Sequence, residues 1–408
     1  MERQELIPHL FRTEYSKITA VLCKLFGIEH IEIAEDIASE TFLSAFETWN
    51  YKGIPANPTA WLYVVAKNKA RNYFIRNRLF AEKIAKQIPH SNSEEEEIQI
   101  DLSEKNITDS QLQMLFAICQ PGITTAAQVG LALRILCGFS IDEIADAFLT
   151  NKDTINKRLF RAKEKLRLDK VLIEFPDNAA INNRLDIVLK TLYLLFNEGY
   201  YSERQDTIVR KELCLEAMRL TYLLIENEST NQHATNALLA LMCFHASRLN
   251  ARTTISGAMI LYPDQDEKLW DDELIARGNY FLQQAAKWNI ISKYYLEASI
   301  AYWHTIKTDS TDKWENILQL YNHLLQLEYS PIAALNRTFA LSKARGKIIA
   351  IAEAEKLHLT DNHFYYILLG ELYKEIDIVK TKLYFQQALS LAKTQTEKQL
   401  IQNKIYML

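Results

Sequence analysis

Lysines and arginines gather in two short stretches, where they could bind the phosphates of a nucleic acid. Residues 57–81 hold five of these bases and no acid, with aromatic side chains interleaved, and residues 150–170 hold eight bases against three acids. Residues 29–47 are the reverse, with six acids and no base. The net charge of −4 argues weakly against a nucleic-acid partner, because binding needs bases that displace counterions. Any such partner is therefore expected at the two basic stretches.

Side chains able to catalyse reactions or hold metals are present, but their spacing does not form an active site. Five acids crowd one loop and could ligate a hard cation: Asp264, Asp266, Asp271, Asp272 and Glu273. A loop that leads into a helix N-terminus is the favoured interpretation, since carboxylates stabilise that end of the helix dipole. The histidines lack metal-ligand spacing, and the sequence contains no glycine-rich phosphate loop, nucleophile elbow or His-Glu-x-x-His. We expect no enzyme activity, no cofactor and no metal site.

The elements that must position the basic residues are predicted to be helices. The 408 residues include only 10 glycines and 8 prolines, where average usage would give roughly 29 and 20. This shortage predicts an all-α fold and disfavours barrels, sandwiches and nucleotide-binding α/β sheets. Apolar stretches fall short of the ~18 to 20 residues that cross a bilayer, and the N-terminus lacks a signal-peptide order. We expect a cytoplasmic protein with no membrane partner and with its five cysteines buried and reduced.

Composition divides the chain at two places. Residues 79–111 contain Pro89, a polar run and four consecutive glutamates, a solvated composition that predicts a linker. Pro176 ends the second basic stretch. The predicted parts are a helical domain over residues 1–80, an acidic linker over 81–110, a second helical domain over 111–172 and a third over 180–408.

The first predicted domain pairs an acidic helix with a basic one. Apolar residues recur at three- to five-residue intervals from Ile33 to Trp49, which puts them on one helix face. The acids left largely outside that face are Glu35, Asp36, Glu40 and Glu47. Residues 51–58 contain one glycine and two prolines and must form a loop. A helix from about Thr59 then carries the basic, aromatic-interleaved surface.

The second predicted domain ends in a helix-turn-helix pattern. Ser140 and Glu143 have the spacing of a capping box that opens a helix over residues 141–148. A turn at 149–151 leads into a second helix over 152–168, which is rich in lysine and arginine. Two helices joined by a three- or four-residue turn, the second of them basic, are the layout of a DNA-recognition motif.

Residues 180–408 show a nearly continuous helical pattern with short polar breaks, which predicts stacked helix pairs. The last pair fits a tetratricopeptide repeat, because residues 366–373 and 381–388 match its two helices if the turn is one residue short. The other pairs match this pattern only weakly. The expected third domain is therefore an α-helical repeat of the tetratricopeptide type.

Four short runs match motifs of one protein family. They are Ala34-Glu35-Asp36-Ile37-Ala38-Ser39-Glu40-Thr41-Phe42, Ala60-Trp61-Leu62-Tyr63-Val64-Val65-Ala66-Lys67-Asn68, Gly138-Phe139-Ser140-Ile141-Asp142-Glu143-Ile144-Ala145 and Thr154-Ile155-Asn156-Lys157-Arg158-Leu159-Phe160-Arg161-Ala162-Lys163. Through them the first ~170 residues resemble bacterial RNA polymerase sigma factors of the extracytoplasmic-function (ECF) group of the sigma-70 family. Ser39 stands where that family often has glutamine. The remainder looks like the helical-repeat extension of a subgroup with recurring marks at residues 197–200 and 264–270.

The resemblance implies a subunit that brings core RNA polymerase to promoter DNA on the bacterial nucleoid. Residues 1–80 would be sigma domain 2 and residues 111–172 sigma domain 4. The implied contacts with core polymerase are Asp36, Glu40, Thr41, Phe42 and Phe46. The implied contacts with the minus-10 element are Lys52, Asn57, Trp61, Tyr63, Lys67, Asn68, Lys69, Arg71, Asn72 and Arg76. The implied contacts with the minus-35 element are Lys152, Asp153, Thr154, Asn156, Lys157, Arg158, Arg161 and Lys165.

The physics of promoter melting agrees with these roles. Unpaired bases stack on aromatic rings while cations bind the backbone, and Trp61, Tyr63 and Tyr73 lie among the bases of the first basic stretch. Trp61 and Tyr73 could equally be core residues. Lys52 and Asn57 are the side chains expected near pockets for flipped bases.

Two alternatives from other classes stay open. The chain could be a helical-repeat interaction protein whose N-terminal helices only support assembly. It could also be a one-component transcriptional regulator that uses its helix-turn-helix alone, although the predicted melting helix would then have no role. For the sigma-factor interpretation, the resemblance implies that the C-terminal repeats dock a protein or peptide partner or regulate the first two domains, by restraint or by support.

Overall fold

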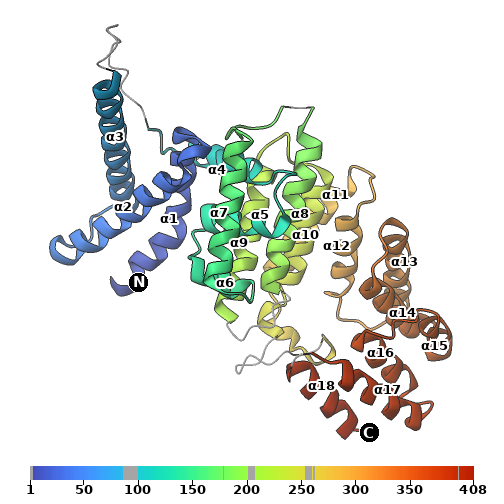
Figure 1. Cartoon of the computed structure of the whole chain (residues 1–408). Coiled ribbons are helices and arrows are strands. Elements are labelled where there is room, and N and C mark those ends of the chain that lie inside the picture. The colour runs from blue at the N-terminus through green and yellow to red at the C-terminus, as the bar shows by residue number, and fades with distance from the viewer. Residues whose placement is uncertain are drawn as a thin grey trace. The chain divides into compact units, whose positions relative to one another are not determined.

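The computed structural model describes residues 3–85, 100–177, 179–200, 207–252, 260, 262–393 and 395–408, and they form an all-α protein (Figure 1). The predicted fold class is confirmed, since no strand occurs among these residues. The helices belong to two compact units. Unit 1 comprises residues 1–202 and 208–230, and unit 2 comprises residues 203–207 and 231–408.

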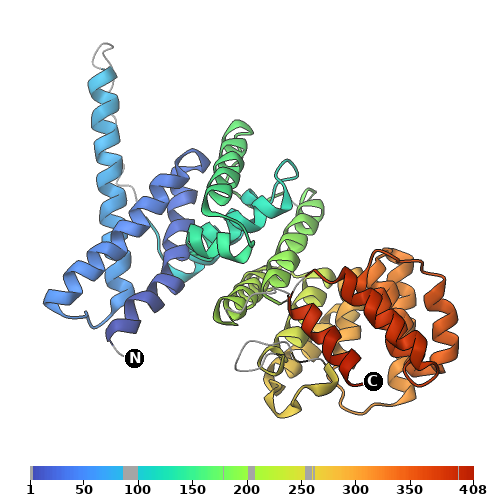
Figure 2. The ribbon, with the colours of Figure 1, turned by 60° about the horizontal axis from the view of Figure 1, so that its bottom comes forward.

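Unit 1 is built around its first helix. The elements of unit 1 are α1 (Arg3–Phe26), η1 (Ile28–His30), α2 (Ile31–Lys52), α3 (Pro58–Ala85), α4 (Glu104–Ile118), α5 (Thr125–Leu131), η2 (Ala132–Leu136), α6 (Ile141–Ala147), α7 (Lys152–Leu168), α8 (Ile181–Tyr200) and α9 (Thr207–Glu226). Helix α1 packs against α2, α3, α4 and η2, and its residues Tyr15, Ile18 and Leu22 are fully buried. The long helix α3 extends beyond the ends of α1 and α2 (Figures 1 and 2).

The predicted linker over residues 81–110 is shorter in the structure. Helix α3 continues to Ala85, and α4 already begins at Glu104. The Ser103 hydroxyl caps α4 by accepting a hydrogen bond from the Asn106 amide at 3.4 Å, and Ile107 is buried against the rest of the unit. The acidic run at 94–97 lies outside the described residues.

The predicted start of the third domain at residue 180 also differs from the structure, because α8 and α9 belong to unit 1. Helix α8 buries its apolar face, and Thr191 donates a hydrogen bond to the Gln128 side chain at 2.7 Å. Arg219 of α9 donates to the Leu136 carbonyl at 2.7 Å. The helical pattern of the sequence runs from α8 into unit 2 with only short polar breaks. The pattern by itself therefore could not place the boundary near Thr230.

Unit 2 is a succession of antiparallel helix neighbours. Its elements are α10 (His233–Ala246), η3 (Leu249–Ala251), η4 (Tyr262–Asp264), η5 (Glu267–Leu269), α11 (Asp272–Ala286), α12 (Lys293–Trp303), α13 (Thr311–Leu327), α14 (Pro331–Arg345), α15 (Lys347–Glu355), α16 (His363–Tyr373), α17 (Ile378–Leu391) and α18 (Gln395–Tyr406). Most of these helices pack chiefly on their neighbours in the chain, and α12 packs most extensively on α10; such short-range packing is typical of repeat proteins.

Two glycines of unit 2 allow close helix packing. A Cβ atom on Gly278 would lie 2.6 Å from the Phe244 ring, and one on Gly370 would lie 2.5 Å from the Phe385 ring. Gly370 and Phe385 are both positions of the predicted tetratricopeptide pattern. Their contact between α16 and α17 explains why a residue without a side chain is needed there.

Candidate nucleic-acid interface

The exposed face of α2 is where the structure places most of the acids expected to bind polymerase. Asp36 and Glu40 are exposed, and Phe46 retains 56% of its side-chain surface. Leu43, equally exposed, and Glu47 lie on the same side of the helix and were not among the predicted contacts. Their positions three and seven residues after Glu40, about one and two helical turns further on, could have indicated them.

Two of the predicted polymerase contacts are core residues instead. Thr41 is buried and its hydroxyl donates to the Ile37 carbonyl at 2.7 Å. Phe42 is buried in contact with the Phe11 ring of α1, with centroids 5.0 Å apart. Neither side chain has surface to offer a partner, so we correct their expected role from contact to support of the exposed α2 face.

The loop before α3 is organised by helix ends. Gly53 ends α2 with a φ of 85°, a conformation that favours glycine. Asn57 caps α3, because its side-chain oxygen accepts a hydrogen bond from the Ala60 amide at 3.0 Å. Lys52 is exposed, and beside it Tyr51 is 92% exposed. Tyr51 was missed as a candidate contact, although an aromatic residue next to a lysine was a visible signal.

The predicted DNA contacts of α3 with basic or amide side chains divide into exposed and half-buried groups. Asn68, Arg71, Asn72 and Arg76 are exposed. Lys67 and Lys69 are half-buried. Lys69 forms a salt bridge of 3.1 Å with Glu40 of α2, so one predicted DNA contact is bonded to a predicted polymerase contact.

The aromatic residues of α3 are held by packing. Trp61 meets Trp49 edge to face with ring centroids 5.3 Å apart, and Tyr73 meets Phe26 in the same way at 5.3 Å. Tyr63 donates a hydrogen bond to Glu14 at 2.6 Å. Burial is the largest cause that raises the pKa of Tyr63, and the hydrogen bond to Glu14 raises it further. One edge or face of each ring is therefore already occupied inside unit 1.

The predicted capping box at the start of α6 is confirmed. The Glu143 amide donates to the Ser140 hydroxyl at 3.2 Å, and the Ser140 amide donates to the Glu143 carboxylate at 2.7 Å. A turn over residues 148–151 joins α6 to α7, and the Asn151 side chain caps α7 by accepting from the Thr154 amide at 2.8 Å. These local bonds set the layout of two helices joined by a short turn.

Helix α7 presents most of the predicted minus-35 contacts on its outer face. The exposed ones are Lys152, Asp153, Asn156, Lys157, Arg161 and Lys165. Thr154 is half-buried, and the Arg158 guanidinium lies over the Phe148 ring at 5.2 Å. Lys152 and Lys165 pair with Asp142 and Asp169 at 3.0 and 2.8 Å, surface contacts that bound phosphate would have to replace.

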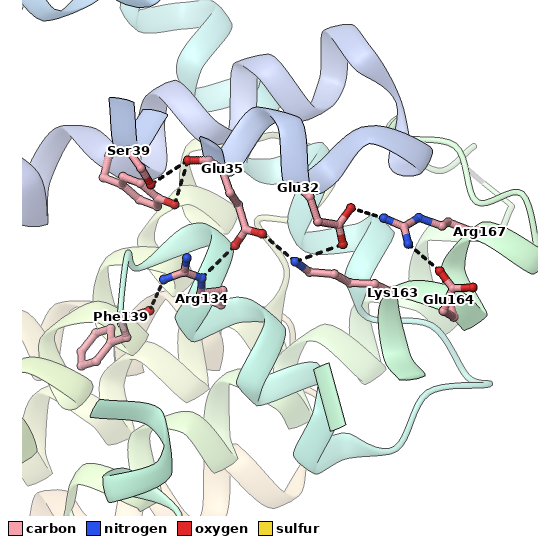
Figure 3. A network of polar contacts seen from close by, with 9 residues as sticks. Glu32, Glu35, Ser39, Arg134, Phe139, Lys163, Glu164 and Arg167 are labelled. Carbon is pink, nitrogen blue, oxygen red and sulfur yellow. Dashed lines mark hydrogen bonds and ion pairs between the residues drawn. The ribbon is translucent and has the colours of Figure 1, made fainter. Parts of the chain in front are cut away.

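The inner face of α7 carries bases that do not face solvent. Lys163 is buried, and its ammonium donates to the Glu35 carboxylate of α2 at 2.6 Å. The other oxygen of Glu35 accepts from Arg134 of η2 at 2.8 Å (Figure 3). Arg167 bonds to Glu32 and Glu164, and Lys163 also lies 3.6 Å from Glu32 (Figure 3). We call the residues Glu32, Glu35, Arg134, Lys163 and Arg167 the α2–α7 network.

The burial of Glu35 overturns the expectation that it lies on the solvated face of the acidic helix. Only 7% of Glu35 is exposed. A helical pattern separates apolar from polar residues, whereas burial of a carboxylate depends on cations that reach it from elsewhere in the fold. Those cations are supplied by residues 99 and 128 positions further along the chain.

The acidic loop of unit 2 serves as a set of helix caps. Asp266 accepts a hydrogen bond from the Lys268 amide at 3.0 Å and caps η5. Asp271 accepts from the Leu274 amide at 3.0 Å and caps α11. Across the described part of the chain, no group of three or more histidines, cysteines or acids could hold a metal ion. The five cysteines are buried thiols, as predicted.

None of the described helices is both long enough and apolar enough to span a bilayer.

Comparison with known proteins gives matches for two segments and for most of the chain. Residues 10–79 match the family model of Sigma-70 region 2, and residues 184–286 match a family of unknown function (DUF6596). A protein of Rhizobium meliloti strain 1021, described as uncharacterized, is 32% identical over 377 residues, which cover 90% of this chain and 88% of the relative. No solved structure matches. The chain therefore belongs to the family of that Rhizobium protein, and its residues 10–79 form a domain of the Sigma-70 region 2 type.

Proposed function

We propose that the protein is a sigma factor of the ECF group that directs core RNA polymerase to specific promoters and starts transcription there. The observation that carries this proposal is the Sigma-70 region 2 match over residues 10–79, which spans α2 and most of α3. Within that match, the acidic helix α2 has a solvent-facing side and α3 has a basic one. The presence of Sigma-70 region 2 implies binding to core polymerase and to promoter DNA.

The exposed side of α2 is the proposed polymerase contact. Asp36 and Glu40 supply charge, while Leu43 and Phe46 supply apolar surface that is unusual for an exposed helix face. An apolar centre with charged neighbours is the composition of many protein interfaces. Thr41 and Phe42 support this surface from beneath.

The basic side of α3, with the neighbouring loop, is the proposed minus-10 contact. Arg71 and Arg76 are exposed and are the proposed contacts with the DNA backbone, and the exposed Asn68 and Asn72 offer hydrogen bonds from the same side of the helix. Trp61, Tyr63 and Tyr73 are only half-buried, so each keeps surface that could stack on an unpaired base. Tyr51 is a further stacking candidate because of its exposure.

The outer face of α7 is the proposed minus-35 contact. A recognition helix lies in the major groove with its first turns against the bases. Asp153, Asn156 and Lys157 occupy those turns, and Arg161 and Lys165 follow on the same face. Lys157 and Arg161 are therefore the pair whose removal tests the assignment.

A reconstituted transcription assay tests this function. The purified protein and core polymerase should co-elute and give a promoter-dependent transcript. Lys157→Ala with Arg161→Ala should reduce that transcript by about 30-fold or more, because base and phosphate contacts contribute about 1–3 kcal/mol each. The matched control removes two exposed bases from α11 and its C-cap in unit 2, Arg277→Ala with Lys287→Ala, and should leave the transcript unchanged. Absence of both co-elution and transcript contradicts the proposal, and duplex binding without core polymerase would favour the one-component regulator.

Unit 2 is proposed to be a docking or regulatory module of the tetratricopeptide type. Its role has to be tested by ending the chain after Thr230, since α8 and α9 form part of unit 1. Ending the chain near Asp177 would remove α8 and α9 from unit 1. A loss of activity in that shortened protein would then report misfolding of unit 1 and not the role of unit 2. A protein shortened after Thr230 that transcribes as well as the full chain would contradict a regulatory role in this assay.

A further inference from the structure

Unit 2 carries a group of large aliphatic side chains on its surface, at two neighbouring turns. They are Ile348 and Ile349 at the start of α15, and Ile376, Ile378, Val379 and Leu383 in and just before α17, each of them about half exposed or more. The salt bridge between Lys347 and Glu375 at 2.6 Å places the two turns side by side, and both helices pack on α16 (Figure 1). We call this group the aliphatic patch. Single apolar residues are ordinary on a protein surface, whereas a contiguous group marks an interaction site.

The rim of the aliphatic patch presents positive charge. The two acids nearest to it in the sequence are already bonded, Glu375 to Lys347 and Asp377 to the first amides of α17. Three exposed bases stand in the same segment and have no acid within ion-pair distance in the described part of the chain: Lys374, Lys380 and Lys382. A partner that covers the aliphatic side chains therefore also meets lysines whose charge is available.

The first turns of α17 show how the two kinds of side chain are arranged. Val379 and Leu383 are four residues apart and lie on one face of the helix, opposite the buried Phe385. At 3.6 residues per turn, Lys380 and Lys382 flank this apolar stripe, one on each side. A stripe bordered by lysines is the complement of an amphipathic helix whose own apolar stripe is bordered by acids.

Two other occupants fit the aliphatic patch less well. A second copy of the chain, joined patch to patch, would bring identical lysines together, and like-charge repulsion opposes that contact. Proteins that rest on a lipid surface typically present tryptophan and tyrosine at the level of the headgroups, and the aliphatic patch contains neither. An acidic amphipathic helix matches both the aliphatic side chains and the lysines.

We propose that the aliphatic patch binds a short acidic amphipathic helix of a partner protein. Aliphatic side chains of that helix cover the patch, and its carboxylates pair with Lys374, Lys380 and Lys382. The inference rests on the docking role proposed for unit 2, and it names the docking surface and the chemistry of the partner. The apolar contact supplies most of the affinity, while the lysines orient the helix and reject basic ones.

Fluorescence anisotropy with the full-length protein tests the charge preference. The probe is a labelled synthetic helix of about 18 residues, or five turns, with leucines on one face and glutamates beside them. A second peptide with lysine at every glutamate position should bind about tenfold more weakly, because like charges then meet. Lys374→Glu with Lys382→Glu should reverse this preference. Equal binding of the two peptides to the native protein would overturn the inference.

Substitution of the aliphatic side chains tests the location of the site. Ile348→Asp with Val379→Asp should lower the affinity for the acidic peptide about tenfold or more, because both the apolar contact and the charge match are lost. Both positions are exposed and lie in the first turn of a helix, where an acid favours the helix dipole, so unit 2 should stay folded. The matched control, Ile291→Asp with Ile332→Asp, changes two other exposed isoleucines of unit 2 and should leave binding unchanged. An equal loss in both variants would contradict the assigned location.

Failure of this inference is distinguishable from failure of the proposed function, because peptide binding requires neither core polymerase nor promoter DNA. A protein that transcribes, and whose transcription changes when the chain ends after Thr230, but that does not bind the acidic peptide would overturn the aliphatic patch only. Pelleting with phosphatidylglycerol vesicles in place of peptide binding would assign the patch to a lipid surface and overturn the inference. Self-association that Val379→Asp abolishes would assign it to a second copy, with the same consequence.

Discussion

The two units of the molecule are held together over very different distances along the chain. In unit 1, ion pairs join residues far apart in sequence: Arg167 and Glu32 are separated by 135 positions, Arg12 and Glu143 by 131. In unit 2, ion pairs between neighbouring turns of the stack span shorter separations: 35 positions for Lys293–Glu328, 30 for Arg345–Glu315 and 28 for Lys347–Glu375. Unit 2 is thus a stack of neighbours, whereas unit 1 is closed by contacts between its distant parts.

The difference teaches where each unit can change its structure. A stack loses stability locally, because each helix pair depends chiefly on the next. A body closed by a few distant charged contacts can instead separate along one interface while its helices stay folded. Measurements of stability should therefore respond differently to substitutions in the two units.

The largest effect is expected from the centre of the α2–α7 network. Glu35→Ala leaves Lys163 and Arg134 without their shared buried carboxylate and should lower the free energy of unfolding of unit 1 by about 3–5 kcal/mol. Hydrogen exchange on the full chain would measure this, with Glu47→Ala on the exposed side of α2 as the control. A loss below about 1 kcal/mol would mean that the network behaves as a surface contact.

A smaller and local effect is expected from Gly370 in unit 2. Gly370→Ala places a methyl group against the Phe385 ring and should destabilise α16 and α17 by about 1–3 kcal/mol. Hydrogen exchange should show reduced protection in these helices while unit 1 keeps its protection. Adding Phe385→Leu should restore part of the stability, and loss of protection in unit 1 would contradict the comparison.

The capping box offers a pH-dependent test of unit 1. Burial acts to raise the pKa of Glu143, but hydrogen bonds from the Ser140 amide and Arg12 outweigh it and hold that pKa below its usual value of 4.5. A lowered folded-state pKa means that the ionised carboxylate stabilises the fold above pH 4.5 and that this contribution is lost as the pH falls through the folded value. Glu143→Gln should cost about 1–2 kcal/mol near pH 7, and the difference from the native protein should shrink in acid. An equal difference at pH 7 and pH 3 would show that the charge is not involved.

The smallest effect is expected from an exposed pair in unit 2. Glu328→Gln removes the surface partner of Lys293 and should change the free energy of unfolding by about 0–1 kcal/mol, as measured by urea denaturation. A larger loss would show that neighbouring turns of unit 2 depend on charge as unit 1 does.

Local features of the fold were predictable because their determinants are close in sequence. The capping box needs only Ser140 and Glu143, and the all-α fold follows from the shortage of glycine and proline. The exposed outer face of α7 also agrees with its pattern, since apolar residues such as Ile155 and Leu159 mark the opposite side. In the candidate site, Asp36, Glu40 and the outer bases of α7 are exposed.

Features that depend on packing were not predictable in the same way. Glu35 and Asp36 are adjacent acids of one helix, yet one is buried and the other exposed. In α7, likewise, Lys163 is buried whereas the outer bases are exposed. Composition alone does not distinguish these basic residues. The boundary lies near residue 230 and not at residue 180, because α8 and α9 cluster with unit 1.

The sequence by itself determined the helices, their caps and the two helices joined by a short turn at residues 141–168, because each depends on residues within a few turns of one another. Only the tertiary structure decided which charges face solvent and which face each other. The reason is physical: a charge becomes buried only where folding brings an opposite charge within hydrogen-bonding distance, and for Glu35 and Lys163 that partner lies 128 residues away.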